Sequence, residues 1–170
     1  MKLRSPITIN DKLYPRGATL PWYKIYPFFL VHMLGFGLSG FIMAYSNDGP
    51  EIGFLYLHGG FAILFYTVFY VALFGVDEIK WMFINAALGL LGIYAQIDLI
   101  LSLFGKKAGD FSIFVHVIPF LYYILYTFLL YQLVLDVTGA RDDPHRKRIA
   151  EAFYIVSSVI IYSAIYLTKR

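Results

Sequence analysis

The sequence predicts an all-α membrane protein, a bundle of five transmembrane helices. Of its 170 residues 59% are hydrophobic and only 15% are charged, whereas a soluble domain carries about 25% charged residues. The apolar residues are gathered in five blocks, each near the roughly 20 residues that cross a bilayer. Because these blocks use most of the chain, we expect residues 1–170 to form a single integral membrane domain.

The five predicted spans follow one another with short connections. A polar, basic tail over residues 1–24 comes first, and it lacks the apolar core of a cleavable signal peptide. The connections contain Gly, Pro and Asp, which are typical of tight turns, and their shortness favours antiparallel neighbours. Only the charged segment 139–148 is longer. In chain order the predicted spans are 25–46, 53–75, 81–104, 111–135 and 149–168.

The charged residues between the spans predict the orientation. One side of the membrane carries ten Lys and Arg residues: Lys2, Arg4, Lys12, Arg16, Lys24, Lys80, Arg141, Arg146, Lys147 and Arg148. The other side carries Lys106, Lys107, Lys169 and Arg170. Basic loops stay in the cytoplasm, so we expect a cytoplasmic N-terminus and an outside C-terminus, in the cytoplasmic (inner) membrane of a bacterium. Topology explains the net charge of +3 without a nucleic-acid partner.

Small and polar residues recur at helical spacing within the spans. In the first span Gly35 and Ser39 form a small-xxx-small pair, and in the third Asn85, Gly89 and Gly92 share one face. Such stripes let membrane helices approach closely. We interpret them mainly as packing seams.

Asp98 is the one acidic residue placed well inside a predicted span. Counting along the helices at about 1.5 Å per residue, His58, Asp98 and His116 all lie roughly 7–9 Å below the outer surface of the membrane. A carboxylate at this depth should be paired, neutral or turned to a water-filled cavity. The shared depth predicts that the three side chains form one site near the outer face.

Three kinds of chemistry suit such a site. His58, Asp98 and His116 are a recurrent ligand set for a metal ion, His58 and His116 alone could bind a b-type haem, and all three could relay protons toward the deeper His32. The residues predicted to support or extend the site are His32, Tyr56, Tyr94, Gln96 and Tyr123.

Structural roles for the same residues stay open at this point. Asp98 could reach the outer headgroups or pair with Lys106 or Lys107. Each histidine could hydrogen-bond a carbonyl or a hydroxyl group on a neighbouring helix. The chain has no cysteine, which excludes disulfides and thiolate metal sites.

The predicted function is therefore that of a small membrane subunit that binds a metal ion or haem, or that relays protons or electrons. The alternatives are a non-catalytic accessory or assembly subunit that docks partner membrane helices, and a small homo-oligomeric transporter. The sequence does not decide whether the protein is an enzyme. The lipid bilayer itself is the one partner expected in every case.

Overall fold

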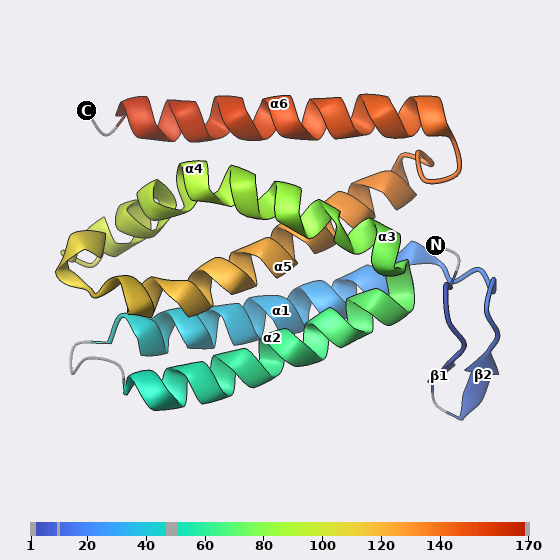
Figure 1. The fold of residues 1–170 in the computed structure, drawn as a ribbon, viewed down its shortest axis with the longest axis horizontal. Coiled ribbons are helices and arrows are strands. Elements are labelled where there is room, and N and C mark those ends of the chain that lie inside the picture. Colours follow the sequence, from blue (N-terminus) through green and yellow to red (C-terminus); the bar gives the residue numbers. More distant parts are fainter. Residues whose placement is uncertain (1–2, 10, 47–50, 169–170) are drawn as a thin grey trace.

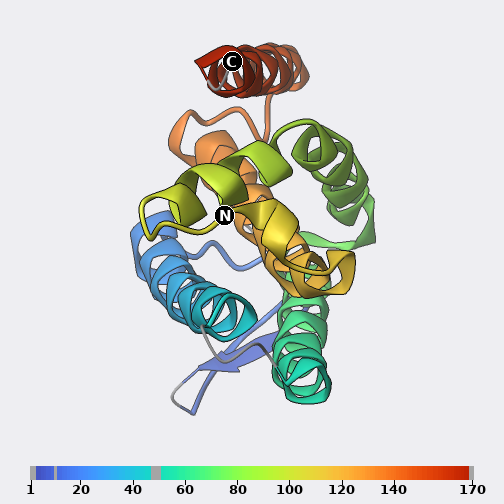
Figure 2. The same cartoon turned by 90° about the vertical axis from the view of Figure 1, so that its left-hand side faces the viewer.

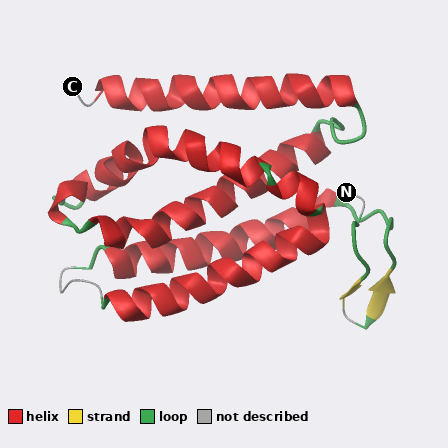
Figure 3. Ribbon diagram, viewed as in Figure 1, coloured by secondary structure: helices red, strands yellow, loops and turns green. Residues whose placement is uncertain are grey.

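The computed structural model describes residues 3–9, 11–46 and 51–168, and it is mostly helical (Figure 1, Figure 3). Five described helices are long and apolar enough to cross a membrane, which confirms the predicted class. They are α1 Trp22–Ala44, α2 Ile52–Phe74, α4 Trp81–Ser102, α5 Ile113–Val137 and α6 Pro144–Thr168. The shorter elements are the strands β1 Ile7–Ile9 and β2 Lys12–Tyr14, the one-turn helix α3 Val76–Ile79 and the 3₁₀ turn η1 Ala108–Asp110.

The last helix begins five residues earlier than predicted, at Pro144. The Asp143 carboxylate accepts the backbone N–H groups of His145 and Arg146 at 2.9 and 3.2 Å. It thereby caps the first turn, and proline suits the position that follows a cap. These hydrogen bonds, first from Arg146 and then from His145, lower the pKa of Asp143. The helix thus starts inside the charged segment that was expected to be a loop.

The N-terminal tail is folded, which the sequence reading did not anticipate. Strands β1 and β2 pair in antiparallel fashion, with Thr8 opposite Leu13. Asp11 in the turn between them has a left-handed φ of 58°. The hydrogen bond from Leu3 N to Ala18 O (3.0 Å) joins the two ends of the tail, and the buried side chain of Leu3 packs into the hydrophobic core.

Helix α5 is the centre of the bundle. It packs against α1, α2, α4 and α6, and half of its most apolar stretch is buried. Seen along the bundle, α1 and α2 lie side by side below α5, and α6 is outermost, above α4 (Figure 2). Only 6% of the corresponding stretch of α6 is buried, so α6 is the helix with the most surface left for lipid.

Glycines mark the closest helix contacts. A Cβ atom added to Gly59 would lie 2.4 Å from Ile118 Cγ2, and one added to Gly92 would lie 2.5 Å from the Tyr162 ring. The stripe on α4 therefore packs closely, as the sequence suggested. The stripe predicted on α1 does not: an added Cβ on Gly35 meets nothing within 4 Å. The buried face of α1 instead carries residues such as Met33 and Ala44.

A buried charged network lies at the end of the bundle that also carries the β1–β2 hairpin (Figure 1). The Arg141 guanidinium group donates to both carboxylate oxygens of Asp136, and the Tyr26 hydroxyl donates to Asp136 as well. Lys147 pairs with Glu78 at 2.7 Å. Burial by itself would lower the pKa of Arg141, but its hydrogen bonds to Asp136 and the charge of that carboxylate raise it above the ordinary value.

Three of the basic residues from which the orientation in the membrane was predicted lie outside the described residues. They are Lys2, Lys169 and Arg170.

Candidate functional site

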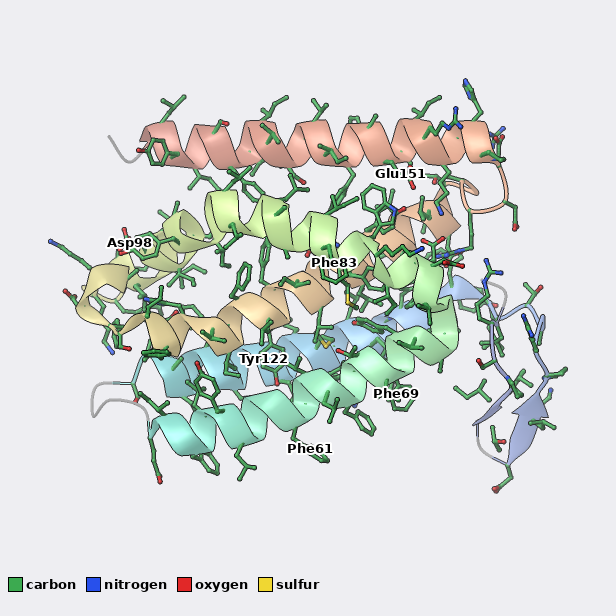
Figure 4. The ribbon with its side chains drawn as sticks, viewed as in Figure 1. Phe61, Phe69, Phe83, Asp98, Tyr122 and Glu151 are labelled. Carbon is green, nitrogen blue, oxygen red and sulfur yellow. The ribbon has the colours of Figure 1, made fainter. Side chains whose placement is uncertain are left out.

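Asp98 anchors the connection between α4 and α5. It is half-buried near the end of α4 (Figure 4), and its Oδ1 accepts the backbone N–H of Ala108 at 2.8 Å. Ala108 is fully buried in the 3₁₀ turn η1. A backbone N–H that donates to a carboxylate forms a charge-assisted hydrogen bond, which stabilises Asp98 where it is partly removed from water. Its partner is thus a backbone amide ten residues ahead in the chain.

His116 belongs to the same end of the bundle. Its Nδ1 lies 2.7 Å from the Tyr45 hydroxyl group, and its ring packs edge-on against Tyr94 at 5.9 Å. It also has a hydrogen bond with the backbone of Ala108. Asp98 and His116 therefore hold one turn from two helices, which gives their shared depth a structural explanation.

His58 does not join them in a metal site. The described residues contain no group of three or more His, Cys, Asp or Glu side chains that could hold a metal ion. The three-ligand site expected from His58, Asp98 and His116 is therefore not found. The physical reason lies in helix packing: the residue next to His58, Gly59, is the one that meets Ile118 of α5, whereas His58 lines a groove between α2 and α1.

This α1–α2 groove has a volume of about 680 Å³ and is strongly aromatic. Its polar lining residues are His32 on α1 and His58 and Tyr66 on α2. Figure 4 shows that Phe61 and Phe69 project from the side of α2 that faces away from α5. The phenylalanines that line the groove are Phe28, Phe29, Phe36, Phe54, Phe61, Phe65 and Phe69.

The two histidines in the groove are held differently. His32 uses Nδ1 for a 2.8 Å hydrogen bond with the Phe28 carbonyl oxygen, which leaves its Nε2 for another partner. The His58 ring lies between Phe36 and Phe54, at centroid distances of 5.9 and 6.0 Å. Its Nε2 is buried and has no hydrogen-bond partner within the described chain. Buried polar atoms are normally paired, so His58 calls for an explanation.

Two more unpaired polar groups lie beside this region. The hydroxyl groups of Tyr70 and Tyr122 are buried without a hydrogen-bond partner in the described residues. Tyr66, which lines the groove, is near enough to both for the phenol groups to interact electrostatically. Helices α2 and α5 thus bring several unused hydrogen-bonding groups to one part of the bundle.

The residues predicted to support the site tie helices together. Tyr56 donates to the Phe114 carbonyl oxygen at 2.8 Å, Gln96 hydrogen-bonds the Tyr162 side chain, and Tyr123 fits against Gly89. Tyr56 thus joins α2 to α5, Gln96 joins α4 to α6, and Tyr123 joins α5 to α4.

Sequence reasoning missed the groove, although a signal was present. Along α2, an aromatic stripe at helical spacing contains His58: Phe54, His58, Phe61, Phe65 and Phe69. This stripe marks one face of the helix, but the sequence does not say which neighbour adjoins it. Tyr45, which holds His116, was also missed, because it lies beyond the end of α1 and far from His116 in the chain.

Comparison of the chain with protein-family models, with curated proteins and with solved structures gives no match, so the function is inferred from the site itself.

Proposed function

We propose that this membrane protein binds a quinone-class lipid in the α1–α2 groove. In this proposal the polar ring of the ligand accepts a hydrogen bond from His58, and its isoprenoid chain lies along the phenylalanines. The observation that carries the proposal is the buried Nε2 of His58, which has no partner among the described residues and lies beside a mostly aromatic groove. The function would be a version of the predicted electron- or proton-relaying role, with a lipid-soluble ring in place of a metal ion or haem.

The length of the groove supports a chain-like ligand. Its lining on α2 extends from Phe54 to Phe69, which is about 22 Å along a helix. A volume of about 680 Å³ spread over that length describes a long, narrow groove that is open along the outside of the two helices. Aromatic side chains offer large apolar faces to such a ligand. An isoprenoid chain suits this shape better than the broad disc of a haem.

The polar groups support a head group that accepts hydrogen bonds. A buried polar nitrogen without a partner costs about 1–3 kcal/mol. In the tautomer that carries the proton on Nε2, a bound carbonyl oxygen would remove that penalty at His58. His58 lies six residues from the start of α2, about 9 Å along the helix axis. The ring would therefore sit at one end of the groove, and the chain would extend toward Phe69. Tyr66 is the second groove residue able to donate a hydrogen bond to the ring.

The proposal rests on His58 alone rather than on the pair His58 and His116. His116 is tied to Tyr45 and to the Ala108 turn, whereas the Nε2 of His58 has no hydrogen-bond partner among the described residues. His32 stays a candidate for a second polar contact, because its Nδ1 is already oriented by the Phe28 carbonyl group.

Titration of the detergent-purified protein with a benzoquinone that carries a decyl chain tests the proposal. His58→Leu should weaken binding about tenfold, since it removes one hydrogen bond at similar side-chain size. Phe61→Ala should also weaken binding, whereas Phe83→Ala should not. These two phenylalanines are matched in exposure, at 72% and 76%, but Phe83 lies on α4, outside the groove.

Two results would contradict the proposal. Equal affinity of the wild-type and His58→Leu proteins would remove the assigned role of His58. A reduced-minus-oxidised spectrum with a Soret band that depends on His58 would show that the histidine binds haem instead. Mass spectrometry of a solvent extract of the purified protein then identifies any lipid that copurifies.

A further inference from the structure

A second pocket, of about 540 Å³, lies at the opposite end of α2 from His58. Three arginines line it: Arg4, Arg16 and Arg141. Its apolar part is formed by Leu3 of the N-terminal tail and by Leu73 and Phe74 in the last turn of α2. Asp142 is the one carboxylate in this lining. The pocket thus combines guanidinium groups with the end of a helix that is expected to leave the membrane there.

The folded N-terminal tail brings two of the arginines to the pocket. The hydrogen bond from Gly17 N to Leu3 O, at 2.9 Å, places the segments that hold Arg4 and Arg16 next to each other. The aliphatic part of Arg4 lies over Gly75, where an added Cβ would be 3.4 Å from Arg4 Cγ. Gly75 has a positive φ of 88°, so the chain turns sharply at this point and leaves room for the Arg4 side chain.

Arg141 is the fixed donor of the group. Its hydrogen bonds to Asp136, Tyr26 and Gln132 use Nε and Nη2, and its guanidinium carbon lies 5.7 Å from the centre of the Phe74 ring. Within the part of the chain that the structure describes, Nη1 donates no hydrogen bond. An arginine held in this way keeps its charge and presents its remaining N–H groups in one direction.

Arg4 and Arg16 are exposed and form no ion pair with the described residues. They are therefore available to an anion from outside the chain. The planar guanidinium group matches a phosphate group, because two parallel N–H groups can reach two of its oxygen atoms.

We propose that the pocket formed by Arg4, Arg16 and Arg141 binds the phosphate group of an anionic membrane lipid. The phosphate would lie between the arginines, next to the buried side chains of Leu73 and Phe74, and the acyl chains would extend into the surrounding bilayer. A lipid headgroup is the favoured source because the pocket adjoins the end of a helix that can span the membrane, the level at which anionic lipids attract arginine. This proposal does not depend on the quinone proposal, since the two pockets share no lining residue.

The test uses the full chain in micelles of a zwitterionic detergent. Dissociation constants are measured for short-chain phosphatidylglycerol, for the matching phosphatidylcholine and for inorganic phosphate. The double variant Arg4→Gln, Arg16→Gln should bind phosphatidylglycerol roughly 30-fold more weakly, at about fivefold for each arginine near the membrane surface. Because both side chains are exposed, the variant should keep the thermal stability of the wild-type protein.

The matched control is Lys12→Gln, Arg148→Gln. Lys12 and Arg148 were predicted to lie on the same side of the membrane as Arg4 and Arg16. Both are exposed and lie outside the pocket lining. The control therefore removes two positive charges, as Arg4→Gln, Arg16→Gln does. This variant should bind phosphatidylglycerol within about twofold of the wild-type value.

An equal loss of phosphatidylglycerol binding in both double variants would overturn the proposal, because the lipid would then be attracted by all the basic residues on that side of the membrane and not by the pocket. Failure of the wild-type protein to bind either phosphatidylglycerol or inorganic phosphate would overturn it too. Arginine-dependent binding of inorganic phosphate alone would support a phosphate site and assign its source to a soluble compound.

Discussion

Most ionisable side chains inside or beside the spans have a specific partner. Asp98 accepts a backbone N–H, His116 is bonded to Tyr45, and Asp136 is paired with Arg141. A charged side chain inside a membrane is tolerated when it has such a hydrogen-bond or ion-pair partner. His58 departs from the pattern, because its Nε2 is buried without a partner in the described chain. For this reason the functional proposal rests on His58 rather than on Asp98, although Asp98 was the more conspicuous residue in the sequence.

The pair Asp136–Arg141 should be important for stability. Its side chains are 4% and 13% exposed, whereas those of the pair Asp77–Lys80 are 96% and 74% exposed. Asp136→Asn should lower the free energy of unfolding by about 3–5 kcal/mol, because Arg141 is left as an uncompensated buried charge. Asp77→Asn should change it by less than about 1 kcal/mol.

Tryptophan fluorescence during thermal unfolding measures both variants. Trp81 is a suitable reporter because its ring stacks on Tyr131 at 4.4 Å. Equal stability of the two variants would mean that solvent screens the Asp136–Arg141 pair.

At the scale of the helices, close approach depends on a few glycines. Gly59 lets α2 approach Ile118 of α5, and this contact decides which face of α2 is left for the groove with α1. The next residue, Gly60, has open space where a Cβ would be. The two neighbouring glycines therefore differ in what they do for the fold.

Gly59→Ala should destabilise the protein, and Gly60→Ala should not. The added methyl group at Gly59 overlaps Ile118, and overpacking typically costs about 1–3 kcal/mol. At Gly60 the same change meets no atom, so stability should be unchanged or slightly higher, because alanine favours the helix. Thermal unfolding of both variants is the measurement. Ile118→Ala removes Cγ2, the atom that an added Cβ at Gly59 would meet first, so the costs of Gly59→Ala and Ile118→Ala should be less than additive. Strictly additive costs would place the overlap elsewhere.

The sequence predicts this fold to the extent that hydrophobic blocks determine it. The five spans follow from composition and length, and the depth of Asp98 follows from counting along a helix. The partner of Asp98 could not be predicted, because it is a backbone N–H in a 3₁₀ turn that only the folded connection creates. The groove at His58 could not be predicted either, because helical spacing gives the faces of α2 but not their neighbours. The hairpin was missed for another reason, since strands of three residues give little periodicity.

The whole molecule separates its loops into two groups. The N-terminal hairpin, α3 and the connection from α5 to α6 lie at one end, and the turn η1 lies with the last turn of α6 at the other (Figure 1). The end with the hairpin contains the Arg4–Arg16–Arg141 pocket and the buried charged network. Polar side chains are thus gathered at both ends of the bundle: a charged group at the hairpin end, and Asp98 with His116 around the turn η1 at the other end.

The distribution of Lys and Arg predicts that the hairpin end faces the cytoplasm. Because the chain has no cysteine, a single cysteine can report the side directly. Thr8→Cys, in β1, should react with a membrane-impermeant maleimide only after the cells are permeabilised, and Lys107→Cys, beside η1, should react in intact cells. Both positions are exposed, so a difference in labelling reflects the side of the membrane. The reverse pattern would place the arginine pocket in the outer leaflet, and labelling of both variants in intact cells would mean that the chain inserts in two orientations.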